Sequence, residues 1–169
     1  RAESAMTGEA RSWRSAALAL AALPVLLSCA TSPTGYTVDF GRAGLAWEGT
    51  QPHQILVERT SVVPRDVGGY TALGFEIHPP GDEPYQVYSV HYLPEARVPA
   101  PLPDGFEAVA NGGIKTSTDT VVGPRVFSFG FDETDPLGLY RIEVFVNGRL
   151  AGEASIQVVE PDSYPPAPR

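Results

Sequence analysis

Cysteine, lysine and long apolar runs are scarce in this sequence. The 169 residues include one cysteine, Cys29, and one lysine, Lys115. A single cysteine cannot form a disulfide within the chain. No apolar run reaches the 18 or more residues typical of a transmembrane helix. The net charge of −8 argues against nucleic acid as a partner, because nucleic-acid binding selects for basic surfaces.

Catalytic and cofactor-binding motifs are also missing. The chain has no Gly-x-Ser-x-Gly elbow, no glycine-rich phosphate loop and no His-Glu-x-x-His motif. Its histidines are His53, His78 and His91. If residues 70–78 and 85–93 form a hairpin, His78 and His91 lie toward its opposite ends and do not converge on a metal. We therefore predict no catalytic residue, no cofactor and no metal ligand, and we expect the histidines at the surface or in turns.

One acidic segment leaves two interpretations open. Asp132, Glu133 and Asp135 resemble the oxygen-rich calcium-binding loops found between sandwich domains. A calcium site needs about six to eight oxygen ligands, more than this segment supplies. Aspartate and proline are also ordinary turn residues. The sequence does not decide between calcium binding and a plain turn.

The first 28 residues have the pattern of an export signal. Arg11 and Arg14 form a short positive segment, and residues 16–27 form an apolar segment of 12 residues. This length lies within the roughly 7–15 residues of a signal peptide's apolar region and is too short to span a membrane. We therefore predict a helical signal peptide over residues 1–28, with Met6 as the natural start of translation.

The end of this segment, Leu26-Leu27-Ser28-Cys29, resembles the lipobox of bacterial lipoproteins. The resemblance implies cleavage before Cys29, diacylglycerol on its sulfur and acylation of the new amino terminus. Several acyl chains exceed the roughly two membrane signals that stable anchoring requires. By the enterobacterial sorting rule, Ala30 favours the outer membrane, with the protein facing the periplasm. The alternatives are an ordinary secretory signal cleaved near Ala30 and a buried apolar helix with an incidental cysteine.

Two proline-containing segments flank the predicted domain. Residues 29–36 are the lipidated cysteine and a short polar tether. Residues 161–169 form a Pro-rich tail that we expect to be extended and mobile, with a role as a ligand for a partner as the alternative. Residues 37–160 remain as one β domain of ordinary size.

The last part of this domain has the clearest strand pattern. In residues 139–146 the apolar side chains alternate with Arg141 and Glu143, so they occupy one face of a strand; these apolar residues are Tyr140, Ile142, Val144 and Val146. Asn147-Gly148 predicts a type I′ hairpin turn. We predict a three-stranded meander of residues 125–131, 139–146 and 149–159, against which the rest of the domain packs.

Shorter strand-like segments precede this meander. They are Tyr36–Phe40, Leu45–Glu48, Gln54–Val63, Tyr70–His78 and Tyr85–Leu93. Asn111-Gly112-Gly113 predicts a second hairpin within residues 106–118. Trp47 is expected to anchor the core or an edge. Seven to eight short strands with regular turns predict an all-β antiparallel sandwich.

Gly138-Leu139-Tyr140 resembles the tyrosine corner of immunoglobulin-like domains, in which the tyrosine hydroxyl bonds to upstream backbone. The resemblance implies an immunoglobulin-like or fibronectin-like sandwich. Ile142 stands where a disulfide-bonded immunoglobulin domain has cysteine, so it implies a sandwich without that disulfide. A small lipocalin-like β-barrel is the alternative.

These observations predict a lipid-anchored, non-catalytic binding or accessory module. Its contacts are the membrane, through Cys29, and a protein or envelope polymer. Tyr88, Val90 and Tyr92 share one strand face and mark either a binding surface or ordinary sheet packing. A structural component of an envelope complex and an envelope hydrolase are the alternative functions.

Overall fold

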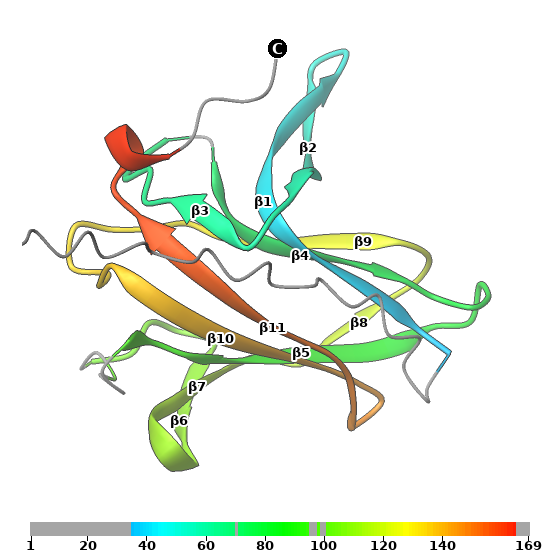
Figure 1. Ribbon diagram of the computed structural model, residues 1–169. Coiled ribbons are helices and arrows are strands. Elements are labelled where there is room, and N and C mark those ends of the chain that lie inside the picture. Colours follow the sequence, from blue (N-terminus) through cyan, green and yellow to red (C-terminus); the bar gives the residue numbers. More distant parts are fainter. Residues whose placement is uncertain (1–34, 70, 95–97, 99–100, 165–169) are drawn as a thin grey trace, which may run out of the picture.

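The computed structural model describes residues 35–69, 71–94, 98 and 101–164. They form eleven strands in two sheets that pack face to face (Figure 1). The predicted signal peptide, Cys29 and most of the tether lie outside the described residues, as do residues 165–169. Within the described part, no helix is long and apolar enough to cross a membrane.

The first sheet has four antiparallel strands. Their spatial order is β2 (Gln51–Arg59), β1 (Thr37–Glu48), β4 (Ala72–His78) and β9 (Arg125–Phe129). Two edges remain without a strand partner among the described residues, β2 on one side and β9 on the other.

The second sheet has seven strands. Their order is β3 (Val62–Pro64), β11 (Arg149–Val159), β10 (Gly138–Val146), β5 (Tyr85–Tyr92), β7 (Gly113–Thr116) and β6 (Phe106–Val109). A short strand, β8 (Asp119–Val121), pairs with β5 beside β7. The described residues also include the 3₁₀ turns η2 (Ala110–Gly112) and η3 (Pro161–Ser163).

This strand order confirms the predicted immunoglobulin-like sandwich. The order β1-β4-β9 matches strands A, B and E of an immunoglobulin domain, and β5-β10-β11 matches strands C, F and G. The barrel alternative is excluded because the strands divide into two separate sheets. The strands outnumber the predicted seven to eight because β3, β6, β7 and β8 are pieces of three or four residues.

The core lies between the sheets. Tyr140, Ile142, Val144 and Val146 are all buried, as their alternation predicts, and they face Phe40, Leu73, Phe75 and Ile77 of the first sheet. The Tyr140 hydroxyl donates a 2.8 Å hydrogen bond to the carbonyl oxygen of Pro136, which confirms the tyrosine corner. Burial raises the pKa of this phenol.

The predicted turns are confirmed at both positions. Asn147 and Gly148 have φ angles of 49° and 76°, and they join β10 to β11 in the predicted hairpin. Asn111 and Gly112 also have positive φ angles, and they lie in η2 between the paired strands β6 and β7. Asparagine and glycine tolerate this backbone conformation better than other residues.

The predicted meander is wrong in its first strand. β10 pairs with β11, but β9 pairs with β4 in the opposite sheet. Phe127 of β9 lies across from Phe75 of β4, and their rings stack with centroids 5.1 Å apart. The expected pairing of residues 70–78 with 85–93 is wrong for the same reason, since β4 and β5 belong to different sheets.

Candidate functional site

The β1–β2 hairpin extends beyond the sandwich. Residues 37–40 of β1 pair with β4 alone, residues 41–43 pair with both β2 and β4, and residues 44–48 pair with β2 alone. The hairpin therefore projects past the end of β4 as a two-stranded ribbon (Figure 1). We call residues 44–55 the ribbon. The structure thus joins the predicted strands 36–40 and 45–48 into one, β1.

The ribbon exposes apolar side chains. Trp47 is 64% exposed, and Leu45 is also exposed two residues earlier on the same strand face. Just beyond the ribbon, Val57 of β2 is exposed as well. The prediction that Trp47 anchors the core or an edge is wrong, because β1 carries this residue past the region where the two sheets meet. A projecting apolar surface of this kind is typical of an interaction site.

A groove of about 760 Å³ adjoins the ribbon. It lies on the outer face of the first sheet, where Leu45, Glu76 and Val126 come from β1, β4 and β9. The β2 wall runs from Pro52 to Leu56, and Arg125 adds a cation at the β9 end. The groove therefore combines aliphatic and proline side chains with polar ones, including one acid, one base and His53.

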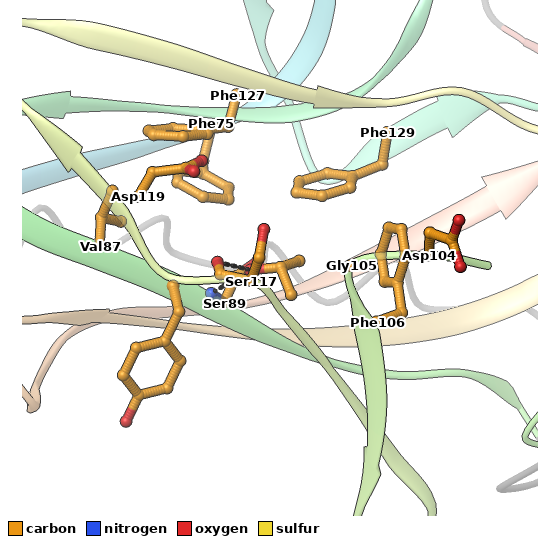
Figure 2. Close-up of a pocket in the computed structure, with 12 residues that line it drawn as sticks. Phe75, Val87, Ser89, Asp104, Gly105, Phe106, Ser117, Asp119, Phe127 and Phe129 are labelled. Carbon is orange, nitrogen blue, oxygen red and sulfur yellow. Dashed lines mark hydrogen bonds between the residues drawn. The ribbon is translucent and has the colours of Figure 1, made fainter. Parts of the chain in front are cut away.

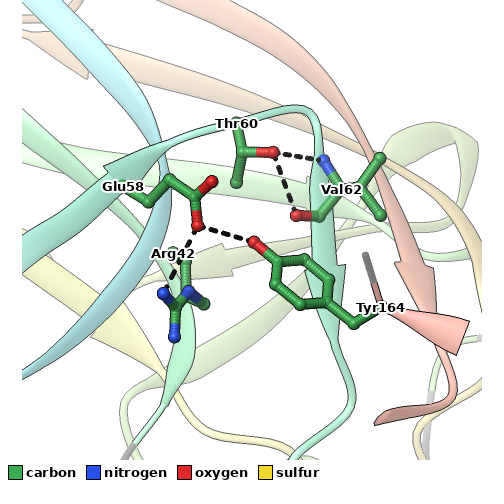
Figure 3. Close-up of polar contacts among 5 residues, drawn as sticks. All are labelled: Arg42, Glu58, Thr60, Val62 and Tyr164. Atoms are coloured by element: carbon green, nitrogen blue, oxygen red, sulfur yellow. Dashed lines mark hydrogen bonds and ion pairs between the residues drawn. The ribbon is translucent and has the colours of Figure 1, made fainter. Parts of the chain in front are cut away.

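The C-terminal segment supports the base of the ribbon. The Tyr164 hydroxyl donates a 2.7 Å hydrogen bond to the Glu58 carboxylate, which also pairs with the Arg42 guanidinium at 3.3 Å (Figure 3). The same guanidinium lies 5.6 Å from the centre of the Tyr164 ring. The sequence predicts an extended tail, but its first residues, 161–163, form a 3₁₀ turn that brings Tyr164 to β2.

The three histidines lie in separate surroundings. His53 lines the groove, and His78 lies 3.2 Å from the Asp39 carboxylate on the first sheet. Asp39 is buried and also pairs with Arg59 at 2.6 Å. Among the described residues, no group of three histidine, cysteine or acidic side chains could hold a metal ion.

His91 is buried, so the expectation of a surface or turn position is wrong for it. Its Nε2 atom lies 2.8 Å from the Ser89 hydroxyl oxygen, and its ring meets Phe129 edge-on with centroids 4.2 Å apart. Burial lowers the pKa of His91 to about 4, so the ring is neutral at pH 7. In the described part of the chain no carboxylate bonds to this ring, so Ser89 and His91 do not form a catalytic triad.

The acidic segment folds into a turn that uses its own carboxylates. Asp132 accepts hydrogen bonds from the backbone N–H and the hydroxyl of Thr134, at 2.7 and 2.6 Å. These bonds lower the pKa of Asp132. Asp135 accepts a 2.7 Å bond from the Asp132 backbone N–H. This bonding pattern accounts for the acidic residues as turn formers.

The tyrosine face of β5 is filled by its neighbours. Tyr88 stacks on Phe145 of β10, with ring centroids 4.9 Å apart and an interplanar angle of 7°. Lys115 lies 5.1 Å from the centre of the Tyr88 ring, and Arg141 lies 3.9 Å from the centre of the Tyr92 ring. Val90 between them is buried. Because the rings are engaged in these contacts, the face is explained by sheet packing.

Comparison with known proteins gives one family. Residues 46–159 match the family model described as "PM0630 beta sandwich domain". No curated protein matches the chain. An immunoglobulin-like protein from Pseudomonas aeruginosa (PA1606) aligns at 18% identity and a TM-score of 0.39, over 72% of this chain and 91% of its own. A Pseudomonas fluorescens alkylpurine DNA glycosylase, AlkC, aligns at 12% identity and a TM-score of 0.31, over 72% of this chain and 30% of its own.

Proposed function

The chain belongs to the PM0630 beta sandwich domain family, and on that premise we propose that it is a lipid-anchored, non-catalytic binding module of the bacterial envelope. Its ligand is an extended segment of a partner protein, which binds along the ribbon and the adjoining groove. The observation that carries this proposal is the 64% exposure of Trp47 at the end of a strand that leaves the sandwich.

The position of the ribbon suits a protein attached at Cys29. The tether meets the domain at Thr37, where β1 begins, and Trp47 lies near the other end of this 12-residue strand. A strand of that length spans about 40 Å. An eight-residue tether reaches at most about 28 Å from the lipid. With the lipid on Cys29, the ribbon therefore points away from the attachment point, toward partners.

The open edge of β2 favours an extended polypeptide as the ligand. Natural edge strands are protected by charges, prolines or bulges, because an unprotected edge pairs with another strand. β2 has a proline at position 52 and a bulge at Val57, but Gln54, Ile55 and Leu56 between them form an uncharged run without either protection. Pairing with this edge would let the partner's apolar side chains contact Leu45 and Trp47.

An envelope polysaccharide is less well matched to this surface. Sugars stack on the faces of large aromatic rings, and Trp47 is the one such ring that the ribbon offers besides the smaller imidazole of His53. The groove beside it combines aliphatic and proline side chains with Gln54, Glu76 and Arg125. A peptide, which carries both apolar side chains and polar groups, complements this mixture better than a hydroxyl-rich polymer. Nucleic acid is also disfavoured, because the chain carries a net charge of −8.

Site-specific photo-crosslinking in intact cells tests the proposal. A photoreactive phenylalanine replaces Trp47 on the ribbon, and the control places the same residue at Val122, which is 62% exposed but lies outside the groove and the ribbon. We expect one partner protein to cross-link to position 47 and not to position 122. The cross-linked residue of the partner should lie in an extended segment of that protein. Equal labelling at both positions, or attachment to glycan alone, would contradict the proposal.

A further inference from the structure

A second feature of the fold lies away from the ribbon, at the edge of β5. β7 pairs with residues Val90–Tyr92 of this strand, and β8 pairs with Tyr85–Val87. Between β7 and β8, the backbone hydrogen bonding along this edge of β5 is interrupted. Here the Ser89 backbone N–H donates a 3.0 Å hydrogen bond to the Thr116 hydroxyl oxygen instead. β-Bulges, which also interrupt strand pairing, are over-represented next to active sites, and this gap invites the same comparison.

The interruption opens a pocket of about 170 Å³ between the two sheets (Figure 2). One wall is aromatic and comes from Phe75, Phe127 and Phe129 of the first sheet. The Phe75 ring stacks on the other two, with centroid separations of 5.1 and 6.0 Å. The facing wall is mixed: Ser89 and Ser117 provide hydroxyl groups, and Val87 and Phe106 are apolar. The pocket is thus largely apolar with a few hydrogen-bonding groups, as small-molecule sites are.

The charges around this pocket all have the same sign. Asp104 and Asp119 are its charged lining residues, and no lysine or arginine lines it. Both aspartates are exposed at the rim. Within the described residues, neither carboxylate makes an ion pair or a side-chain hydrogen bond. The buried His91 beside Ser89 is neutral, since burial holds its pKa at about 4.

We propose that this pocket binds a small organic cation, an ammonium group carried on an apolar body. The half-buried rings of Phe127 and Phe129 contact the apolar body and attract the cation, while the buried Phe75 holds these two rings in place and Asp104 and Asp119 supply the opposite charge. The size is suitable, because a cavity of about 150 Å³ is known to accept benzene. The ligand is a free molecule and not a phospholipid headgroup, because the same two carboxylates repel a phosphate diester.

Calorimetric titration of the protein, purified in an uncharged maltoside detergent, tests this site. The probes are choline, its neutral isostere 3,3-dimethylbutan-1-ol, and phosphocholine. We expect saturable binding of choline, with affinity at least about tenfold higher than for the neutral isostere, since cation–π and charge contacts are both lost without the charge. Phosphocholine is expected to bind more weakly than choline.

Two variants of matched chemistry assign the effect to the pocket. Asp119→Asn removes one rim charge and keeps the side chain's shape, and it should weaken choline binding several-fold. Asp162→Asn makes the same change in η3, outside the pocket, and should leave binding unchanged. Absence of saturable choline binding up to about 10 mM, equal affinity for the neutral isostere, or equal affinity in Asp119→Asn overturns the proposal.

Discussion

Trp47 lies directly across the ribbon from Pro52. The hairpin turn has two residues, which lie between Glu48 and Gln51, so Glu48 and Gln51 form a hydrogen-bonded pair. From this pair onward, hydrogen-bonded and non-hydrogen-bonded residue pairs alternate along the two antiparallel strands. Trp47 and Pro52 therefore form a non-hydrogen-bonded pair, in which the missing N–H of proline weakens no bond within the ribbon. By the same alternation, the backbone N–H of Gln54 points outward from β2, where a partner strand can accept its hydrogen.

Replacing Cys29 with serine should abolish anchoring. The serine hydroxyl is not the nucleophile that takes the diacylglycerol, so the precursor should remain unlipidated and appear in the soluble fraction. Membrane fractionation and intact mass measure this outcome. The unaltered protein should have the mass of residues 29–169 plus acyl groups. Retention of Cys29→Ser in the membrane fraction would mean that the lipid does not hold the protein there.

Replacing Tyr140 with phenylalanine should destabilise the domain by about 1 kcal/mol or slightly more, because the partly buried 2.8 Å hydrogen bond to the Pro136 carbonyl is lost. Urea unfolding monitored by circular dichroism gives the free energy of unfolding. Tyr92→Phe is the matched control, since its hydroxyl makes a 3.3 Å bond on the outer face of the second sheet and should contribute less. Equal losses in the two variants would leave the tyrosine corner without a special role.

Stability should decrease as the pH falls from about 6.5 to 4. His91 is neutral in the fold because burial lowers its pKa to about 4, whereas the unfolded chain takes up this proton near the ordinary value of 6.5. The unfolded state therefore binds more protons in this range, and the stabilising contribution, present above pH 6.5, is lost by as much as about 3 kcal/mol on acidification.

The variant His91→Gln isolates this effect from the carboxylates that titrate in the lower part of the same range. Its free energy of unfolding, measured at several pH values, should fall less steeply between pH 6.5 and 4 than that of the unaltered protein. Parallel pH profiles in the two proteins would show that His91 does not control this dependence.

Replacing Tyr164 with phenylalanine should loosen the base of the ribbon. The change removes the hydroxyl that bonds to Glu58 and leaves the aromatic ring near Arg42. Hydrogen exchange should become several-fold faster at the β2 amides near Glu58, with little change in the second sheet. Ser163→Ala, in the exposed 3₁₀ turn before it, serves as the control. Unchanged exchange at β2 would mean that the C-terminal segment does not support the ribbon.

Local patterns predicted much of the fold. Tyr140, Ile142 and Val144 alternate with polar neighbours, and this period of two identifies the buried face of β10 without any knowledge of its partners. Asn147-Gly148 identifies its turn because few other residues adopt two successive positive φ angles. Both features depend on residues that are close in the sequence.

Strand pairing could not be predicted in the same way. The residues of β9 would fit beside either β10 or β4, and the choice is made by packing of Phe127 and Phe129 on Phe75, more than 50 positions away. The exposure of Trp47 likewise depends on where β4 ends, because β1 continues past it. Its size alone favours burial, and the ribbon was missed for that reason.

The most direct test of strand addition compares Gln54→Pro with Gln54→Ala. The photoreactive residue is at position 47 in both, and the yield of the cross-link to the partner is measured. Proline removes the outward N–H that a partner strand needs, whereas alanine removes only the side chain. We predict that proline abolishes the cross-link and alanine preserves it, with equal thermal stability of the two variants. Equal cross-link yields would contradict binding by the β2 edge.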